Sequence, residues 1–271
     1  MLKAFEIMSN IFPLLDFYPE FKGVLRFDFM QNITSKYGNL YDESNINDHT
    51  KCLKQELAKW ECIINEKPCE EKSKNHLKWH LANPEENKLL PGWKRWTYCN
   101  GLKTADRGIW NKVFTNYMKG NNKTLLECLA YSKDSEILIN YLEIITNTVI
   151  ISKISKSLYN QSHLQFEPIE RAYALNANIF LFILERNIKY MLTSLLNNYK
   201  LIRHGKVKDI VTLIVVINNA YSKRQLDEIK IFVTKELENS IISITDVEKK
   251  IETRLSEIEK QINYFRSLFN N

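Results

Sequence analysis

Apolar residues recur at every third or fourth position through most of this chain, and that spacing is typical of amphipathic helices. The clearest example lies near the end, where successive apolar residues are spaced 4, 4, 3, 4, 3 and 4 apart: Val247, Ile251, Leu255, Ile258, Ile262, Phe265 and Phe269. The segment 149–158 is ambiguous, because its β-branched residues suit a strand as well as a helix. We expect a helix there, since the segments on both sides have helical spacing.

Residues that favour the ends of helices punctuate this pattern. Caps, first-turn prolines and capping-box pairs are predicted at Asp48, Asp134, Pro68, Pro91, Ser222 with Gln225, and Thr245 with Glu248. Interruptions at Asn100-Gly101 and at 120–122 separate further helices from one another. The spacing predicts helices over, among other ranges, 2–15, 48–64, 104–117, 172–196 and 207–220.

About a dozen such helices with short connections predict an all-α fold, in which antiparallel helix pairs stack into an α-solenoid of the HEAT or armadillo type. No repeat of fixed length occurs, so the stack would be irregular. The alternative is a compact, non-repeating helical bundle, because the number of helices does not fix their topology. We expect a single domain over 1–271, with early helices in 1–40, cysteine-bearing helices in 48–145 and closing helices in 146–271.

Composition and charge narrow the class of protein. Only 7 glycines and 6 prolines occur in 271 residues, which disfavours a β protein with many turns. The net charge of +6 comes from 38 basic and 32 acidic residues interleaved along the chain, whereas a nucleic-acid-binding domain usually gathers its basic residues on one face. We therefore expect no nucleic acid partner. The sequence also shows no apolar run of the ~18 residues that span a membrane, no lipid-anchor tail and no signal peptide.

Five cysteines are present, and their spacing bears on the compartment. Cys62 and Cys69 are seven residues apart across a proline-containing turn, Cys99 closes an aromatic helix, Cys128 lies one helix later, and Cys52 is left over. Because no Cys-x-x-Cys pair occurs, such short-range pairs favour the disulfide framework of a secreted protein over a metal site. The alternative is five reduced, buried thiols.

Three Asn-x-Ser/Thr sequons, at Asn32, Asn122 and Asn160, are candidates for N-glycosylation. Such triplets also arise by chance, so each sequon alone carries little weight. Together with the cysteines they are compatible with a secretory route.

Several short motifs follow one another in order along the chain. They are the cysteine pair seven residues apart, Pro91-Gly-Trp93-Lys94, Tyr98-Cys99, Trp110 in the next helix, Leu129-Ala130-Tyr131-Ser132-Lys133, and Tyr141-Leu142. This series resembles the last domain of the gluzincin zinc aminopeptidases, the family of aminopeptidase N, glutamyl aminopeptidase and the endoplasmic-reticulum aminopeptidases. The likeness covers nearly the whole chain, because 14–39 resembles that domain's early helices, and 222–232 and 247–265 its closing helices.

The resemblance implies two disulfides. The first joins Cys62 to Cys69. The family's second disulfide runs from the Tyr-Cys cysteine, here Cys99, to a Leu-Ala-Cys-Ser cysteine whose position is Tyr131 in this chain. Cys128 lies three residues earlier, and residues three apart share a helix face. A small shift of the helix would therefore allow a Cys99–Cys128 bridge.

The catalytic motifs of the family are absent. They comprise a zinc-binding His-Glu-x-x-His, a downstream glutamate and a Gly-x-Met-Glu-Asn loop, and none occurs here. The nearest match, from His76 to His80, has the histidine spacing of a metal pair but carries Leu77 in place of the general-base glutamate. We therefore expect no catalytic, metal or cofactor site in this chain, and an ordinary surface helix at 76–80.

By resemblance, the chain would cover the substrate cavity of a zinc aminopeptidase in the secretory pathway, outside the cell or at a membrane. It would be inactive alone, with a peptide substrate and a zinc-bearing catalytic domain as its partners. The family's domain has further helices ahead of the region matching 2–15, so the isolated chain would expose an apolar face and self-associate. The alternative is a stand-alone α-solenoid interaction module that has lost the enzyme.

Overall fold

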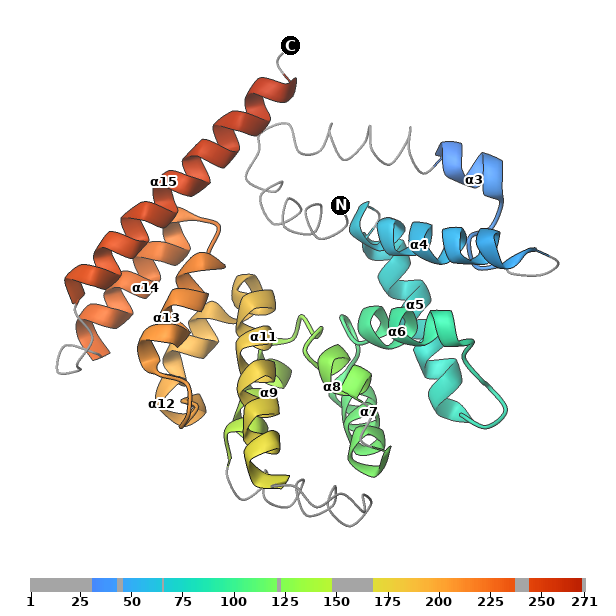
Figure 1. Ribbon diagram of the computed structural model, residues 1–271, viewed down its shortest axis with the longest axis horizontal. Coiled ribbons are helices and arrows are strands. Elements are labelled where there is room, and N and C mark those ends of the chain that lie inside the picture. Colours follow the sequence, from blue (N-terminus) through green and yellow to red (C-terminus); the bar gives the residue numbers. More distant parts are fainter. Residues whose placement is uncertain are drawn as a thin grey trace. The chain divides into compact units, whose positions relative to one another are not determined.

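The computed structural model describes residues 31–42, 46–64, 66–120, 123–147, 168–236 and 244–269, and these residues form twelve helices and no strand (Figure 1). The prediction of an all-α fold is confirmed. The solenoid arrangement stays a prediction. The expected helices at 2–15 and 149–158 lie outside the described residues.

The helices belong to two compact units, the first comprising Met1–Ala105 together with Phe265–Asn271 and the second running from Asp106 to Tyr264. The described helices of the first unit are α3 (Gln31–Tyr37), α4 (Asp48–Ile64), α5 (Glu66–Ala82) and α6 (Pro91–Gly101). Those of the second are α7 (Arg107–Gly120), α8 (Lys123–Leu129), α9 (Ser135–Thr146), α11 (Pro168–Asn197), α12 (Tyr199–Ile202), α13 (Asp209–Asn218), α14 (Lys223–Glu236) and α15 (Ile244–Phe269), the last as far as Tyr264. The single domain over 1–271 stays a prediction.

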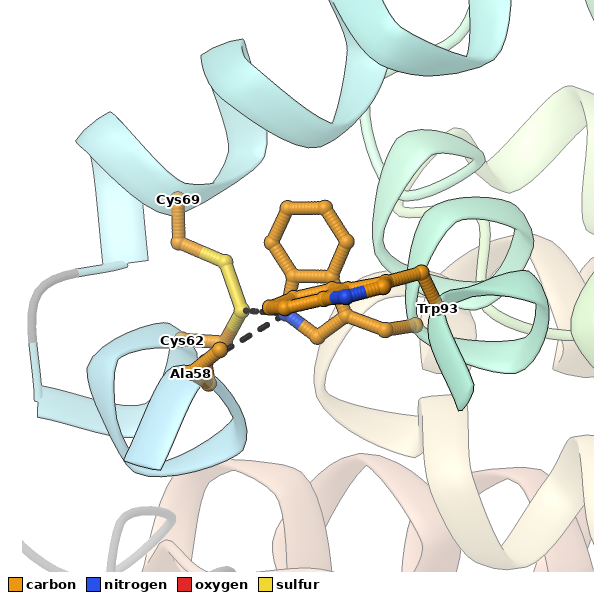
Figure 2. Packing of buried hydrophobic residues seen from close by; sticks show 5 residues of the cluster. Ala58, Cys62, Cys69 and Trp93 are labelled. Atoms are coloured by element: carbon orange, nitrogen blue, oxygen red, sulfur yellow. Dashed lines mark hydrogen bonds between the residues drawn. A yellow bond between two sulfur atoms is a disulfide. The ribbon is translucent and has the colours of Figure 1, made fainter. Parts of the chain in front are cut away.

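The core of the first unit lies where α6 packs against α4 and α5. Buried residues of this core are Ala58, Cys62, Cys69, Trp93 and Trp96, and Figure 2 shows the cystine beside the Trp93 ring. Pro91 opens α6 at its first position, as predicted. Gly101 ends α6 close to α5, since a Cβ atom there would lie 2.8 Å from the Ser73 carbonyl oxygen. A side chain at this position would force the two helices apart.

The second unit gathers around the C-terminal end of α8. Carbonyl groups in the last turn of a helix lack intrahelical donors, and buried side chains of three other helices supply them here. The Trp110 indole donates to the Leu129 carbonyl at 3.0 Å, and the Tyr141 hydroxyl to the Leu126 carbonyl at 2.9 Å. The Asn187 amide of α11 donates to the Ala130 carbonyl, just beyond α8, at 2.8 Å.

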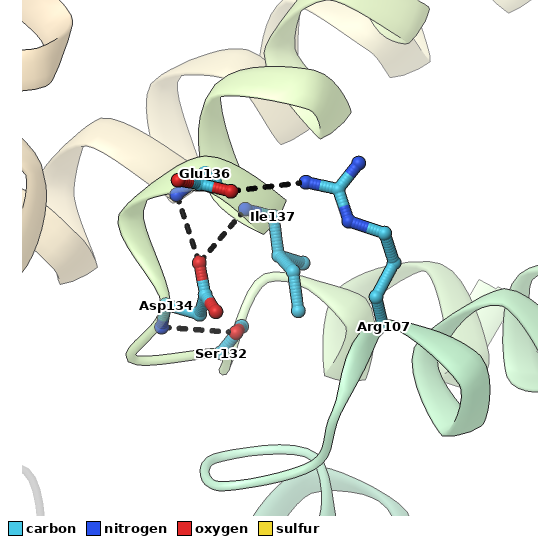
Figure 3. Close-up of polar contacts among 5 residues, drawn as sticks. All are labelled: Arg107, Ser132, Asp134, Glu136 and Ile137. Atoms are coloured by element: carbon cyan, nitrogen blue, oxygen red, sulfur yellow. Dashed lines mark hydrogen bonds and ion pairs between the residues drawn. The ribbon is translucent and has the colours of Figure 1, made fainter.

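Capping residues set several of the boundaries. The Asp134 carboxylate accepts hydrogen bonds from the backbone N–H groups of Glu136 and Ile137 at 2.9 and 3.1 Å, as predicted for the cap of α9 (Figure 3). The Arg107–Glu136 ion pair beside it is 3.7 Å long and exposed, so it contributes little. The predicted pair at Ser222 also forms, because the Ser222 hydroxyl accepts from the backbone N–H of Gln225 at 3.3 Å.

Three other boundaries differ from the expected ones. The cap of α4 is Asn47, whose side-chain oxygen accepts from the Thr50 N–H at 2.8 Å, one residue before the predicted cap. Helix α7 begins at Arg107 rather than at 104, because the Asp106 carboxylate caps the Ile109 N–H at 2.9 Å. Helix α15 begins at Ile244, so Thr245 lies inside its first turn. The first two differences reflect a neighbouring polar side chain that is also a good cap.

Substituting Asp134 tests the cap of α9. We expect Asp134→Ala to lower the free energy of unfolding by about 1 kcal/mol, because two backbone donors lose their acceptor. Urea denaturation followed by circular dichroism measures the change. Asp134→Asn keeps an acceptor and should stay near the parent protein. Equal destabilisation by both variants would contradict the capping role.

His204 is a buried histidine in the connection between α12 and α13, with 4% of its surface exposed. Its Nδ1 atom accepts from the Lys206 backbone N–H at 3.2 Å, so the neutral ring carries its proton on Nε2, which has no hydrogen-bond partner among the described residues. The ring lies 5.4 Å from that of Phe180. Burial, and secondarily the charge of Lys206, lower the pKa of His204. The folded protein therefore favours the neutral imidazole.

Acidification should consequently destabilise the second unit. The unfolded chain binds a proton at His204 below its ordinary pKa of about 6.5, while the folded chain resists protonation. Stability is therefore present above that pH and declines as pH falls toward the folded pKa. His204→Gln should show a smaller loss between pH 7 and pH 5 in urea titrations. His49 is exposed, so His49→Gln is the control. If both variants reduced the pH dependence of the free energy of unfolding equally, this account would be contradicted.

Candidate functional site

The cystine between Cys62 and Cys69 belongs to the core that supports the candidate site. It joins the end of α4 to the start of α5, with the two Cα atoms 5.0 Å apart, inside the range for disulfides. The Trp96 indole N–H donates both to the Ala58 carbonyl at 3.3 Å and to the Cys62 sulfur at 3.2 Å. The predicted cysteine pair therefore shares one core with Trp93 of the next motif and with Trp96.

A short loop after α3 carries Tyr41 onto this core. Gly38 has a φ of 64°, a left-handed conformation that glycine adopts without strain, and it ends α3. The buried Lys54 ammonium donates to the carbonyls of Asn39 and Asp42 at 3.0 and 2.8 Å, which fixes the loop on α4. Tyr41 is thereby held against two indole rings.

The Tyr41 ring centroid lies 5.3 Å from that of Trp93 and 5.1 Å from that of Trp96. Its hydroxyl donates a short hydrogen bond to the Glu61 carboxylate. Burial, followed by this hydrogen bond and the Glu61 charge, raises the pKa of Tyr41 well above its ordinary value. The phenol stays protonated at neutral pH and remains a donor to Glu61.

An open pocket of about 680 Å³ lies over this aromatic core. One wall is a single face of α5, because its lining residues are three or four positions apart. The other walls come from the Tyr41 loop, from 88–90 and from α6. The residues that line the pocket include Tyr41, Lys72, His76, Trp79, Trp93 and Trp96. The volume is within the range of ligand-binding clefts, about 300–1,000 Å³.

Lys72 places a positive charge inside the aromatic wall. Its ammonium lies 3.4 Å from the centroid of the Tyr41 ring, a cation–π contact. Burial lowers the pKa of Lys72, while the charge of Glu61 opposes that shift. The Glu61 carboxylate is itself engaged by the Tyr41 hydroxyl. The pocket therefore offers an exposed cation next to flat apolar surfaces.

The two histidines with metal-like spacing have other partners. His80 Nδ1 lies 2.7 Å from the Asn87 carbonyl oxygen, which can only accept, so Nδ1 donates and Nε2 accepts from the Tyr98 hydroxyl at 2.9 Å. His76 Nδ1 lies 3.1 Å from the Thr97 hydroxyl, and its ring stacks on Trp79 at 5.2 Å. Burial, with the charges of His80 and Lys72, lowers the pKa of His76. Both side chains thus tie α5 to its neighbours.

No group of three or more His, Cys, Asp or Glu side chains that could hold a metal ion occurs among the residues that the structure describes. Across the same ranges, the helices are too short or too polar to span a bilayer. These observations concern the described helices alone.

The remaining candidate residues are distributed over both units. Cys99 and Cys128 are each disulfide-bonded, and Cys52 is an exposed free thiol, so the alternative of five reduced thiols is wrong. Disulfides are typical of proteins from an oxidising compartment. Asn32 is exposed on α3. The other two sequons, Asn122 and Asn160, lie outside the described residues.

A search against protein-family models finds no match, and a search of curated proteins finds none either.

Sequence reasoning did not identify the pocket. Lys72, His76 and Trp79 share one helix face, and that spacing could have grouped them. Tyr41 carried no such signal, because it lies in a polar segment that predicts only a loop. Its placement depends on Lys54, which lies in the next helix.

Removing the cystine tests its contribution to the first unit. We expect Cys62→Ala with Cys69→Ala to lower the free energy of unfolding by about 2.5 kcal/mol, the chain-entropy value for so short a loop. Urea denaturation of the double variant against the parent measures this. Cys52→Ala removes the exposed thiol instead and should change stability by less than about 0.5 kcal/mol. A double variant as stable as the Cys52 control would contradict the role of the cystine.

Proposed function

We propose that this chain is a non-catalytic helical domain of a zinc aminopeptidase of the gluzincin type. One observation carries the proposal: the cysteine pair and Trp93 of the Pro-x-apolar-basic motif, both of which the family's last domain has in this order, lie in one core. There the Cys62 sulfur accepts from the Trp96 indole, beside Trp93.

Under this proposal, the helices form an irregular superhelix that covers the substrate cavity of the enzyme. A separate catalytic domain provides the zinc ion and the residues that cleave the N-terminal residue from a peptide. The disulfides suit a secretory or extracellular setting. The engagement of both His76 and His80 in hydrogen bonds supports a non-catalytic role for this part of the chain.

Isolation from the native source tests the proposal. We expect the chain to be recovered together with the catalytic domain of a zinc aminopeptidase. A chelator should abolish the hydrolysis of aminoacyl-coumarin substrates by this complex. The purified chain with added zinc should show no turnover above background. Chelator-sensitive turnover by the 32.1 kDa chain alone would contradict a non-catalytic role.

A stand-alone interaction module is the second candidate. The observation that favours it is the open aromatic pocket of the first unit, which includes the half-exposed Trp79 and needs no catalytic domain to be complete. This candidate predicts recovery of a lone 32.1 kDa chain bound to proteins that are not peptidases.

A further inference from the structure

We propose that the pocket over α5 and α6 binds an aromatic side chain adjacent to a carboxylate in a peptide segment. This inference goes beyond the proposed function. It rests on the geometry of the first unit alone, and it holds whether or not the chain assembles with a catalytic domain.

The apolar part of the site is built from ring faces. Trp93 and Trp96 are each 5% exposed and stand at 89° to one another, with ring centroids 5.3 Å apart. At the rim, Trp79 and Leu90 are 45% and 56% exposed, so apolar surface continues outward from the pocket. An aromatic side chain would bury this rim surface and contact the exposed part of the Trp79 ring, a contact that stabilises beyond area burial.

The charged part of the site favours an anion. Two lysines, Lys72 and Lys88, and one carboxylate, Asp42, line the pocket, so their formal charges sum to +1. The Glu61 carboxylate also acts on Lys72, but it accepts a hydrogen bond from the Tyr41 hydroxyl. The Lys72 ammonium lies over the Tyr41 ring and is exposed, so a ligand carboxylate that reaches it would form a charge-assisted hydrogen bond. The ligand therefore needs a flat apolar group and a nearby negative charge.

A peptide fits these requirements better than a nucleic acid. A single strand would need cationic groups that follow several successive phosphates. The pocket has only two. In a short peptide, a ring and a carboxylate on neighbouring residues lie within a few ångströms of each other, because consecutive Cα atoms are about 3.8 Å apart.

Three short peptides separate the two parts of the site, tested on the full oxidised chain. They are Ac-Glu-Phe-Glu-NH₂, the neutral Ac-Gln-Phe-Gln-NH₂ and the ring-free Ac-Glu-Ala-Glu-NH₂. Titration calorimetry gives affinities, and the indole N–H signals in NMR spectra report the location. We expect the first peptide to bind about tenfold more tightly than either of the others, with shifts at the pocket tryptophans. Raising the salt concentration should weaken the first peptide selectively.

Matched variants test whether Lys72 causes the preference for the acidic peptide. Lys72→Met keeps the stem but removes the ammonium, and it should reduce the preference for the acidic peptide about tenfold. Lys72→Arg should retain most of that preference. Lys78→Met is the control, because Lys78 is an exposed residue of the same helix that does not line the pocket. Trp79→Ala should weaken all peptides that carry a ring, without changing the charge preference.

Several outcomes would overturn the proposal. They are equal binding of the acidic and neutral peptides, equal effects of Lys72→Met and Lys78→Met, and no binding of any peptide at millimolar concentration. Tighter binding of an oligothymidylate than of Ac-Glu-Phe-Glu-NH₂ would assign the site to nucleic acid instead. Circular dichroism of each variant establishes that it is folded. If Lys72→Met unfolds, the comparison of Lys72→Arg with the parent at high and low salt decides the question.

Discussion

Helices leave the carbonyl groups of their last turn without partners, and much of this structure follows from how buried side chains supply the missing donors. In the second unit, Trp110, Tyr141 and Asn187 donate to three carbonyls at or just beyond the end of α8. Each donor comes from a different helix, so a helix of only seven residues sets the positions of three longer ones. Hydrogen bonds of this kind are costly to leave unmade in a buried site, and they therefore specify one packing among several.

The first unit is held together by a cystine and an indole. The cystine joins α4 to α5 across a one-residue gap between the helices, and the Trp96 N–H group is divided between a carbonyl and a sulfur atom. Gly101 then lets α6 approach the backbone of α5. Together these contacts make a rigid aromatic floor, and Tyr41, Lys72 and His76 are placed over it. The pocket is thus a consequence of how the core is closed.

Local features of the structure could be predicted from the sequence. The cap at Asp134, the start of α6 at Pro91 and the bonding of Cys62 to Cys69 depend on residues close together in the chain. The division at residue 105 could not be predicted, because it depends on which helices pack together. Tyr41 was missed for a related reason. Its position depends on Lys54, and burial of a lysine runs against the usual preference of that side chain for water.

The hold of Lys54 on its loop has a consequence for how this region tolerates sequence drift. The ammonium contacts two backbone oxygens, at positions 39 and 42, and every amino acid supplies such an oxygen. Exchange of the side chains at those two positions therefore leaves the contacts of the lysine intact, whereas the Asn39 side chain adds a contact of its own to the Tyr41 N–H at 3.1 Å. Lys54 itself cannot be exchanged so freely, because few other side chains are long enough and carry donors that reach two acceptors. Lineages that change it would have to rebuild the loop by other means.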